Sequence, residues 1–221
     1  MRTVSRMNTY ILDYGTTNVT PLARCIRVAG FGVEVKNISG IESIDALDLL
    51  ILPGIGKWDY SMEELSQNDL TRQIVSRAEN GGKILGICLG MQLLSLGSQE
   101  GNSSGLGIVK CNVKRINEID DKSPRVNNGW HQISTGSKFV ERGKLSDEVS
   151  YNSSKYYFSH SFAYSSEEMF RIHPEFSVFV PNNRKFVAAF VGANLAGIQF
   201  HPERSHNHGV KFLQRLLEDW S

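Results

Sequence analysis

The stretch KILGICLGMQLL, residues 83–94, decides the fold because a single cysteine joins two kinds of element. Its first five residues, which contain the apolar run Ile84-Leu85, predict a strand, and the residues from Gly90 onward predict a helix. Between them Cys88 stands in the pattern G-x-C-x-G, with Gly86 and Gly90 at the two ends. In this pattern, the nucleophile elbow, the turn is so sharp that the residues flanking the central one cannot carry side chains. The stretch therefore predicts an α/β sheet with Cys88 at a strand end.

The sequence on either side of the elbow predicts one sheet with two parts. Strands and helices alternate in the first half, which favours parallel strands joined by helical crossovers. We expect strands at 8–13, 32–36, 47–52 and 83–87, and helices from Thr20, as N-cap before Pro21, to Ala29 and over 69–79. Short strands follow at 109–116, 129–133, 156–164, 177–180, 186–191 and 195–200, before a helix over 210–220. The fold class is thus a single doubly wound, mostly parallel sheet with an antiparallel extension.

We expect residues 8–221 to form one domain behind a flexible extension, residues 1–7. Those first residues carry two arginines without an apolar pattern, so Met7 is an alternative start to Met1. The 221 residues are enough to bury a core without disulfide or metal support.

The composition excludes several classes of protein. A net charge of +1 without a dense basic run argues against nucleic-acid binding. The sequence contains neither an apolar run long enough to span a membrane nor a secretory signal. Three cysteines without paired spacing indicate a reduced protein, so we expect a cytoplasmic location.

Cys88 is the candidate nucleophile. An arbitrary cysteine is more often a buried structural residue, but here the strand, the glycines and the helix agree on an elbow. The partial positive charge at a helix N-terminus also favours a thiolate. Cys25 lies on the apolar face of its expected helix and Cys111 in an expected strand, so both are predicted to be structural.

A thiolate nucleophile needs a base, and His201 follows the last expected strand. Glu203, two residues on, is suited to orient the imidazole and to stabilise its charged form. His206 and His208 are close in sequence, but they lack a third ligand, so we expect exposed side chains and no metal or other cofactor.

Acyl transfer also needs an oxyanion hole. The turn Pro53-Gly54-Ile55-Gly56 ends the strand expected beside the elbow strand, and its glycines allow backbone N–H groups to approach a substrate. Taken alone, this turn would be equally typical of an ordinary Gly/Pro connection.

Taken in this order, the three motifs resemble the class I (triad) glutamine amidotransferases, because an α/β-hydrolase would place its acid before the histidine. More narrowly, the sequence resembles the glutaminase subunit of imidazole glycerol phosphate synthase. The resemblance rests on Leu12-Asp13-Tyr14-Gly15, Pro53-Gly54-Ile55-Gly56, residues 86–94, Gly129-Trp130, Tyr157-Phe158-Ser159-His160-Ser161 and Gln199-Phe200-His201-Pro202-Glu203.

The resemblance implies a function and a partner. The chain would hydrolyse glutamine and pass ammonia to a (β/α)₈-barrel synthase that makes imidazole glycerol phosphate and an aminoimidazole carboxamide ribonucleotide in histidine biosynthesis. The two would form a heterodimer with hydrolase and lyase activities.

The resemblance also implies roles for particular residues. Cys88 would form a glutamyl thioester, His201 would transfer the proton and Glu203 would orient His201. The remaining residues fall into three groups: oxyanion binding by the backbone of Leu89, Ile55 and Gly56; substrate binding by Gln92, Ser159, His160 and Ser161; and the partner interface at Asn18, Trp130 and Arg204.

Some positions depart from the family pattern. Val126-Asn127-Asn128 replaces a stretch that usually contains proline and histidine, Arg204 replaces a lysine, and Gln99-Glu100 stands where an acidic pair is usual. These departures keep open a paralogous subunit that supplies ammonia to a surface-polysaccharide sugar amidotransferase. A cysteine peptidase and a non-catalytic glutamine-binding regulatory module are further alternatives, although the intact motifs argue against both.

Overall fold

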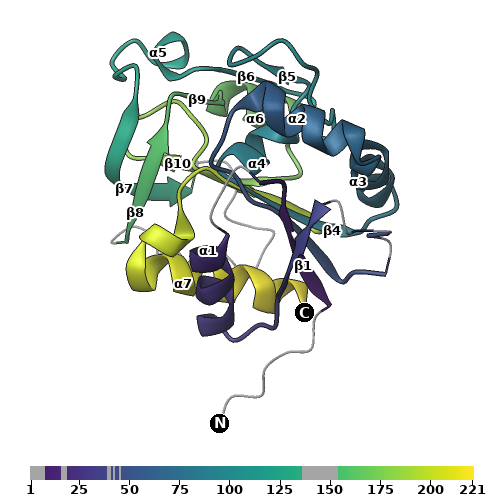
Figure 1. Ribbon diagram of the computed structural model, residues 1–221. Helices are drawn as coiled ribbons and strands as arrows, with labels where there is room; N and C mark the ends of the chain where they lie inside the picture. The colour runs from purple at the N-terminus through teal and green to yellow at the C-terminus, as the bar shows by residue number, and fades with distance from the viewer. Residues whose placement is uncertain (1–7, 16–18, 39–40, 42, 45, 136–153) are drawn as a thin grey trace.

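The computed structural model describes residues 8–221 apart from 16–18, 39–40, 42, 45 and 136–153. A large twisted sheet runs through the molecule, with helices on both faces (Figure 1). In the described chain its nine strands lie in the order β2 (Glu34–Asn37), β1 (Thr9–Asp13), β3 (Leu49–Leu52), β4 (Lys83–Ile87), β12 (Leu195–Ile198), β11 (Ala189–Val191), β10 (Ser177–Pro181), β7 (Asn127–Thr135) and β8 (Lys155–His160).

The sheet has a parallel half and an antiparallel half. Neighbouring strands from β2 to β12 are parallel, and those from β12 to β8 are antiparallel. This arrangement confirms the predicted doubly wound sheet with an antiparallel extension. Gly86 pairs with Leu52 on β3, and Ile87 pairs with Ile198 on β12. The carboxyl ends of these three strands therefore meet at one edge of the sheet.

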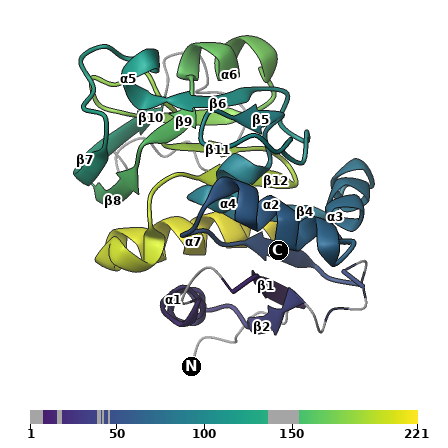
Figure 2. The same cartoon turned by 45° about the horizontal axis from the view of Figure 1, so that its top comes forward.

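Alternating side chains of the parallel strands build two cores. Leu49 and Ile51 face α1 (Thr20–Val28) and α7 (His206–Trp220), which lie side by side under the sheet in Figure 1. Leu50 and Leu52 pack on the other face with residues of α2 (Trp58–Gln67) and α3 (Leu70–Glu79), two helices that Figure 2 shows from a turned view. Burying one such side chain contributes about 2 kcal/mol, so the strands that carry the site are firmly fixed.

The predicted antiparallel extension is wrong in three places: β12, within 195–200, is parallel to β4, the strand within 109–116 belongs to a second sheet, and 156–164 is divided. Residues 156–164 are not one strand, because the chain leaves β8 at Ser161 and continues as β9 (Phe162–Tyr164). With β5 (Gly97–Ser98) and β6 (Asn112–Arg115), β9 forms a separate three-stranded sheet. The His160 side chain bonds the Phe162 carbonyl and the Ser161 carbonyl accepts the Ile116 N–H, which fixes the bend. Apolar alternation gives no sign of such a bend.

Most other predicted elements are present with their ends shifted by a few residues. Thr20 is not the N-cap of α1, because Val19 takes that position without a side-chain bond and Thr20 is the first helical residue. Three helices were not predicted: α2, α5 (Ile116–Ile119), and α6 (Ser166–Ile172), in which Ser165 caps the Glu168 N–H. Within the part of the chain described, none of the helices has the length and apolar character needed to cross a bilayer.

Candidate active site

Cys88 occupies a strained turn between β4 and α4 (Leu89–Leu93). Its backbone has φ 52° and ψ −110°, outside the regions that most side chains allow. A Cβ atom on Gly86 would lie 2.6 Å from Met91 Cα, and one on Gly90 would overlap the Leu52 carbonyl. Cys88 N–H donates to the Ile198 carbonyl on β12 at 2.6 Å. The predicted elbow and its need for both glycines are confirmed.

The structure brings His201 and Glu203 to Cys88. His201 follows β12, the strand beside β4, and its imidazole is hydrogen-bonded to the Cys88 side chain. On the other side, Nδ1 lies 2.9 Å from Glu203 Oε1. Glu203 belongs to the short 3₁₀ helix η4 (Pro202–Arg204), so Pro202 holds it in place.

The surroundings of His201 favour its charged form. The side chains of His201 and Glu203 are 4% and 12% exposed. Burial lowers the pKa of His201, but the hydrogen bonds and charges of Cys88 and Glu203 outweigh burial and raise that pKa to about 10. The three residues thus have the geometry of a cysteine–histidine–acid triad.

Two glutamines connect the nucleophile to the wall of the site. Gln199 Nε2 donates to Cys88 Sγ at 3.7 Å, and Gln199 Oε1 accepts from Gln92 Nε2 at 3.0 Å. Gln92 Nε2 also donates to the Phe162 carbonyl at 2.8 Å. Both side chains are buried. The sequence did not predict a role for Gln199, because the motif gives no sign that its side chain reaches Cys88 at the end of β4.

A pocket of about 210 Å³ opens at Cys88. It gathers every residue predicted for catalysis or substrate binding except Glu203, which stands behind His201. Its lining residues are Gly54, Ile55, Gly56, Cys88, Leu89, Gln92, Glu100, Ser159, His160, Ser161, Phe162, His201 and Arg204.

The segment 54–56 lies against the elbow. A Cβ atom on Gly54 would be 2.5 Å from both Gly90 N and Leu89 Cβ, so only glycine permits this approach. The buried Tyr14 hydroxyl donates to the Pro53 carbonyl and holds the start of the segment. Ile55 is 54% exposed, and the residues after Gly54 lack this close packing. The backbone N–H groups of this turn and of Leu89 are therefore candidates for an oxyanion hole.

His160 is a neutral wall of the pocket. One ring nitrogen, Nδ1, lies 2.9 Å from the Phe162 carbonyl, and the other, Nε2, lies 3.0 Å from Asn127 Nδ2. Since a carbonyl only accepts, Nδ1 carries the proton and Nε2 accepts from the Asn127 amide. Burial, together with the smaller effect of the charge of His201, lowers the pKa of His160 to about 4 against the opposing effect of the hydrogen bond to Phe162.

Glu100 is a site residue that sequence reasoning missed. It is the one carboxylate among the described residues that line the pocket. Burial raises its pKa, while the backbone N–H of Trp58 bonds the carboxylate and the charge of Asp59 adds to the rise. The sequence shows it only as a member of Gln99-Glu100, and nothing local indicates that it faces Cys88.

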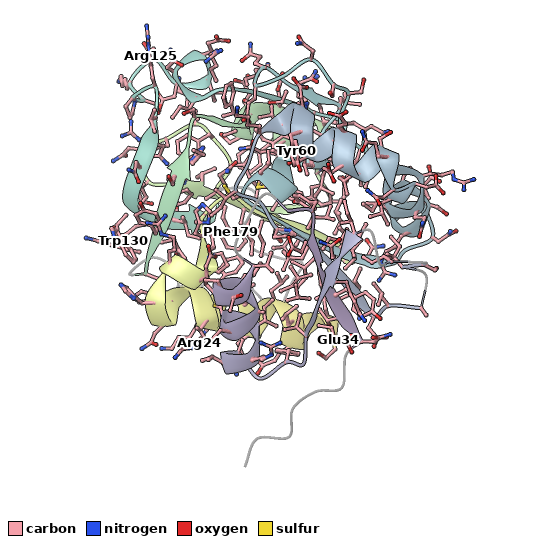
Figure 3. All side chains as sticks on the ribbon, viewed as in Figure 1. Arg24, Glu34, Tyr60, Arg125, Trp130 and Phe179 are labelled. Carbon is pink, nitrogen blue, oxygen red and sulfur yellow. The ribbon has the colours of Figure 1, made fainter. Side chains whose placement is uncertain are left out.

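Two of the residues predicted for a partner interface, Trp130 and Arg204, are exposed, and Arg204 also lines the pocket. Trp130 is 42% exposed, and Figure 3 shows it at the edge of the molecule, pointing outward. Its ring stacks on His206 with the centroids 5.2 Å apart. The Arg204 guanidinium lies 4.1 Å from the ring centroid of Tyr157, which meets Trp130 edge-on. The prediction for Asn18 lies outside the described residues.

The predicted burial of Cys25 and Cys111 and the predicted exposure of His206 and His208 are confirmed. Cys25 and Cys111 are buried, the latter directly before β6, and burial raises their pKa to about 12 and about 11. His206 and His208 are exposed. Across the described ranges, the structure has no group of three or more His, Cys, Asp or Glu side chains placed to hold a metal.

Comparison with known proteins finds one family and relatives that carry the same name. The model of the family "Glutamine amidotransferase class-I" matches residues 10–220. The chain is 33% identical over 211 residues to imidazole glycerol phosphate synthase subunit HisH 2 of Methanococcus maripaludis, which covers 94% of this chain and 98% of that protein. It is 31% identical over 208 residues to subunit HisH of Staphylococcus aureus, with 94% and 95% covered.

Solved structures share the fold at lower identity. PurLQS from Thermotoga maritima matches with a TM-score of 0.66 and 18% identity, over 95% of this chain and 97% of that one. The glutaminase domain of CTPS from Trypanosoma brucei matches with a TM-score of 0.62 and 14% identity, over 96% and 94%.

Proposed function

Since the chain belongs to the class I glutamine amidotransferases, we propose that it hydrolyses glutamine to glutamate and ammonia and supplies the ammonia to a synthase subunit. The observation that carries this proposal is the contact of Cys88 with His201 at the floor of a pocket that also presents a carboxylate, Glu100. A free α-amino acid offers an ammonium group for that carboxylate, and its side-chain amide is the electrophile for the thiolate.

The reaction proceeds through a thioester. Cys88 Sγ attacks the side-chain amide carbon of glutamine, and His201 donates its proton to the departing nitrogen, so that ammonia leaves. Water then attacks the thioester while His201 takes up one of its protons. Glutamate is released, and the thiolate and imidazolium are restored. Glu203 keeps Nδ1 protonated and stabilises the imidazolium, in agreement with the raised pKa of His201.

Backbone groups act on the developing oxyanion. The Leu89 N–H at the start of α4 is one donor, and an N–H of the Ile55–Gly56 turn is the second. Gln92, Ser159, His160 and Ser161 hold the amino acid end of the substrate. Glu100 binds its ammonium group, because it supplies negative charge on the pocket wall.

We infer that the partner is the (β/α)₈-barrel subunit of imidazole glycerol phosphate synthase and that it binds over Asn18, Trp130 and Arg204. The names of the relatives from Methanococcus maripaludis and Staphylococcus aureus support this assignment. The second candidate acceptor is a sugar amidotransferase. Asn127 favours this second acceptor. It is hydrogen-bonded to His160 and belongs to the stretch 126–128, which departs from the proline and histidine usual in the synthase subunits.

One experiment tests the function and a second tests the acceptor. An electrophilic glutamine analogue, a chloroketone, should label Cys88 and spare the buried Cys25 and Cys111, as mass spectrometry of peptides would show. Labelling that is equal at all three cysteines, or that free glutamine does not prevent, would contradict a glutamine site. Purification of the chain from its own cells should then bring down the barrel subunit; recovery of a sugar-modifying enzyme instead would select the other acceptor.

A further inference from the structure

We propose that Asp59 is a positioning residue for glutamine binding, which fastens the loop 99–104 to the start of α2 so that Glu100 faces the substrate ammonium group. The proposal rests on the proposed function of the pocket. Asp59 itself does not line that pocket and acts through Glu100.

Four hydrogen bonds hold the loop to the helix. Asp59 Oδ1 accepts from the backbone N–H groups of Asn102 at 2.9 Å and Ser103 at 2.8 Å, and Oδ2 lies 3.2 Å from Asn102 N. The indole Nε1 of Trp58 donates to the Ser103 carbonyl at 2.9 Å. Hydrogen bonds from Ser103 and Asn102 lower the pKa of Asp59, so its carboxylate is charged at neutral pH.

A glycine in the loop shows how close the contact is. A Cβ atom on Gly101 would lie 2.5 Å from Asp59 Oδ1 and 2.6 Å from Trp58 Cδ1. The loop therefore approaches α2 at a distance that any residue with a side chain would prevent. This observation is independent of the hydrogen bonds and places the loop in the same position.

The bonding is reciprocal. Asp59 accepts N–H groups from the loop, and the Trp58 backbone N–H at the start of the helix stabilises the charged form of the Glu100 carboxylate in the loop, against the rise that burial causes in its pKa. Lys57, the N-cap of α2, makes no side-chain capping bond. The Glu100 carboxylate therefore takes the place of a cap for the Trp58 N–H in the first turn of the helix. The favourable end of the helix dipole thereby keeps a carboxylate in the pocket despite its burial.

The arrangement joins the two ends of the substrate site. The candidate oxyanion turn ends at Gly56, and α2 begins two residues later at Trp58. Asp59 thus ties the loop that carries the ammonium-binding carboxylate to the segment that binds the oxyanion. Loosening the loop should weaken recognition of the ammonium group without removing Cys88 or His201.

The test compares two substrates in the complex with the partner subunit. One is glutamine and the other is 4-carbamoylbutanoate, which has the same side-chain amide and no α-amino group. We expect Asp59→Ala to raise the KM for glutamine roughly tenfold, as expected for disturbing a hydrogen bond to a charged group, and to change kcat far less. Its kcat/KM for 4-carbamoylbutanoate should stay near the wild-type value, so discrimination between the substrates falls.

Two further variants sharpen the result. Asp59→Asn keeps Oδ1, which takes both loop N–H groups, so it should restore most of the discrimination and covers the case in which Asp59→Ala folds poorly. Glu63→Gln changes an exposed carboxylate of the same helix that accepts a hydrogen bond from Gln67, and this variant should behave as wild type. Amide hydrogen exchange at Asn102 and Ser103 should become faster in Asp59→Ala.

Different outcomes overturn different claims. If Asp59→Ala lowered kcat/KM for both substrates equally, or left the discrimination intact, Asp59 would not position Glu100, although the glutaminase function would stand. If the wild-type complex failed to hydrolyse glutamine at all, the proposed function would fall and the role of Asp59 with it.

Discussion

Nδ1 of His201 and Oε1 of Glu203 are 2.9 Å apart, and the carboxylate acts on the nucleophile only through the imidazole. We therefore expect Glu203→Gln to retain more activity than His201→Ala. The first keeps an oxygen beside Nδ1, while the second removes the proton carrier, and general acid–base catalysis contributes about 10²–10⁴ in rate. Steady-state kinetics of the complex with its partner would measure both. Equal losses would contradict this division of roles.

The second prediction separates ammonia production from ammonia use. Cys88→Ala should abolish the glutamine-dependent reaction of the complex, because no thioester can form. The same complex should still react with added ammonium salt at a rate close to wild type, since the partner's site is untouched. Continued use of glutamine by the variant would show that Cys88 is not the nucleophile. Cys111→Ala, at a buried cysteine away from the pocket, is the matched control.

The third prediction concerns coupling to the partner. The Gly54-Ile55-Gly56 turn is held at its start by Tyr14 and after its end by the buried Trp58, and Ile55 between them is exposed. A peptide flanked by glycines can reorient at low cost and present either a carbonyl or an N–H to the substrate. Loss of one oxyanion donor costs about 10²–10³ in rate.

We accordingly expect the isolated chain to hydrolyse glutamine slowly and the complex with bound acceptor to be faster by about that factor. The KM for glutamine should change less than kcat, because the donor acts on the transition state. Kinetics with and without the partner would measure this, and full turnover by the isolated chain would exclude the switch.

The fourth prediction follows from the pKa of His160, about 4 in the folded protein against 6.5 for the ordinary side chain. Between these values the unfolded chain binds the extra proton, so the stabilisation is complete above pH 6.5 and is lost as the pH falls toward 4. The loss amounts to about 3 kcal/mol.

Urea unfolding at pH 7 and at pH 4.5 would measure this effect. The free energy of unfolding of His160→Gln should fall less between these two pH values than that of the wild type. His208→Gln, which changes an exposed histidine, is the control and should lose about as much as the wild type. A wild type and a His160→Gln variant with the same pH dependence would show that His160 is not held neutral.

The sequence allows the catalytic centre to be predicted because its signals are local. Gly86 and Gly90 are required by a turn of a few residues, and His201 and Glu203 sit together at a strand end. The parallel pairing of β4 with β12, which joins these two local patterns, was not predicted, because 195–200 follows a series of short strands and was assigned with them to the antiparallel extension.

The features that could not be predicted depend on contacts between distant segments. Helix α2 begins without a capping side chain on Lys57, because the Trp58 N–H finds its partner in Glu100. The small sheet forms because the chain bends at Ser161, and nothing in the apolar pattern of 156–164 marks that point. In both cases contacts between distant segments decide the local structure, and local sequence patterns do not predict such contacts.

The central place of β12 has a consequence for synthesis on the ribosome. β4 can pair with β3 soon after both have emerged, but its other edge stays open until residues 195–198 are made, more than 100 residues later. An open strand edge in a nascent protein favours wrong pairing, so shielding of β4 during this interval would protect the growing chain. The same delay means that Cys88 and His201 cannot meet before residues 195–201 have been made.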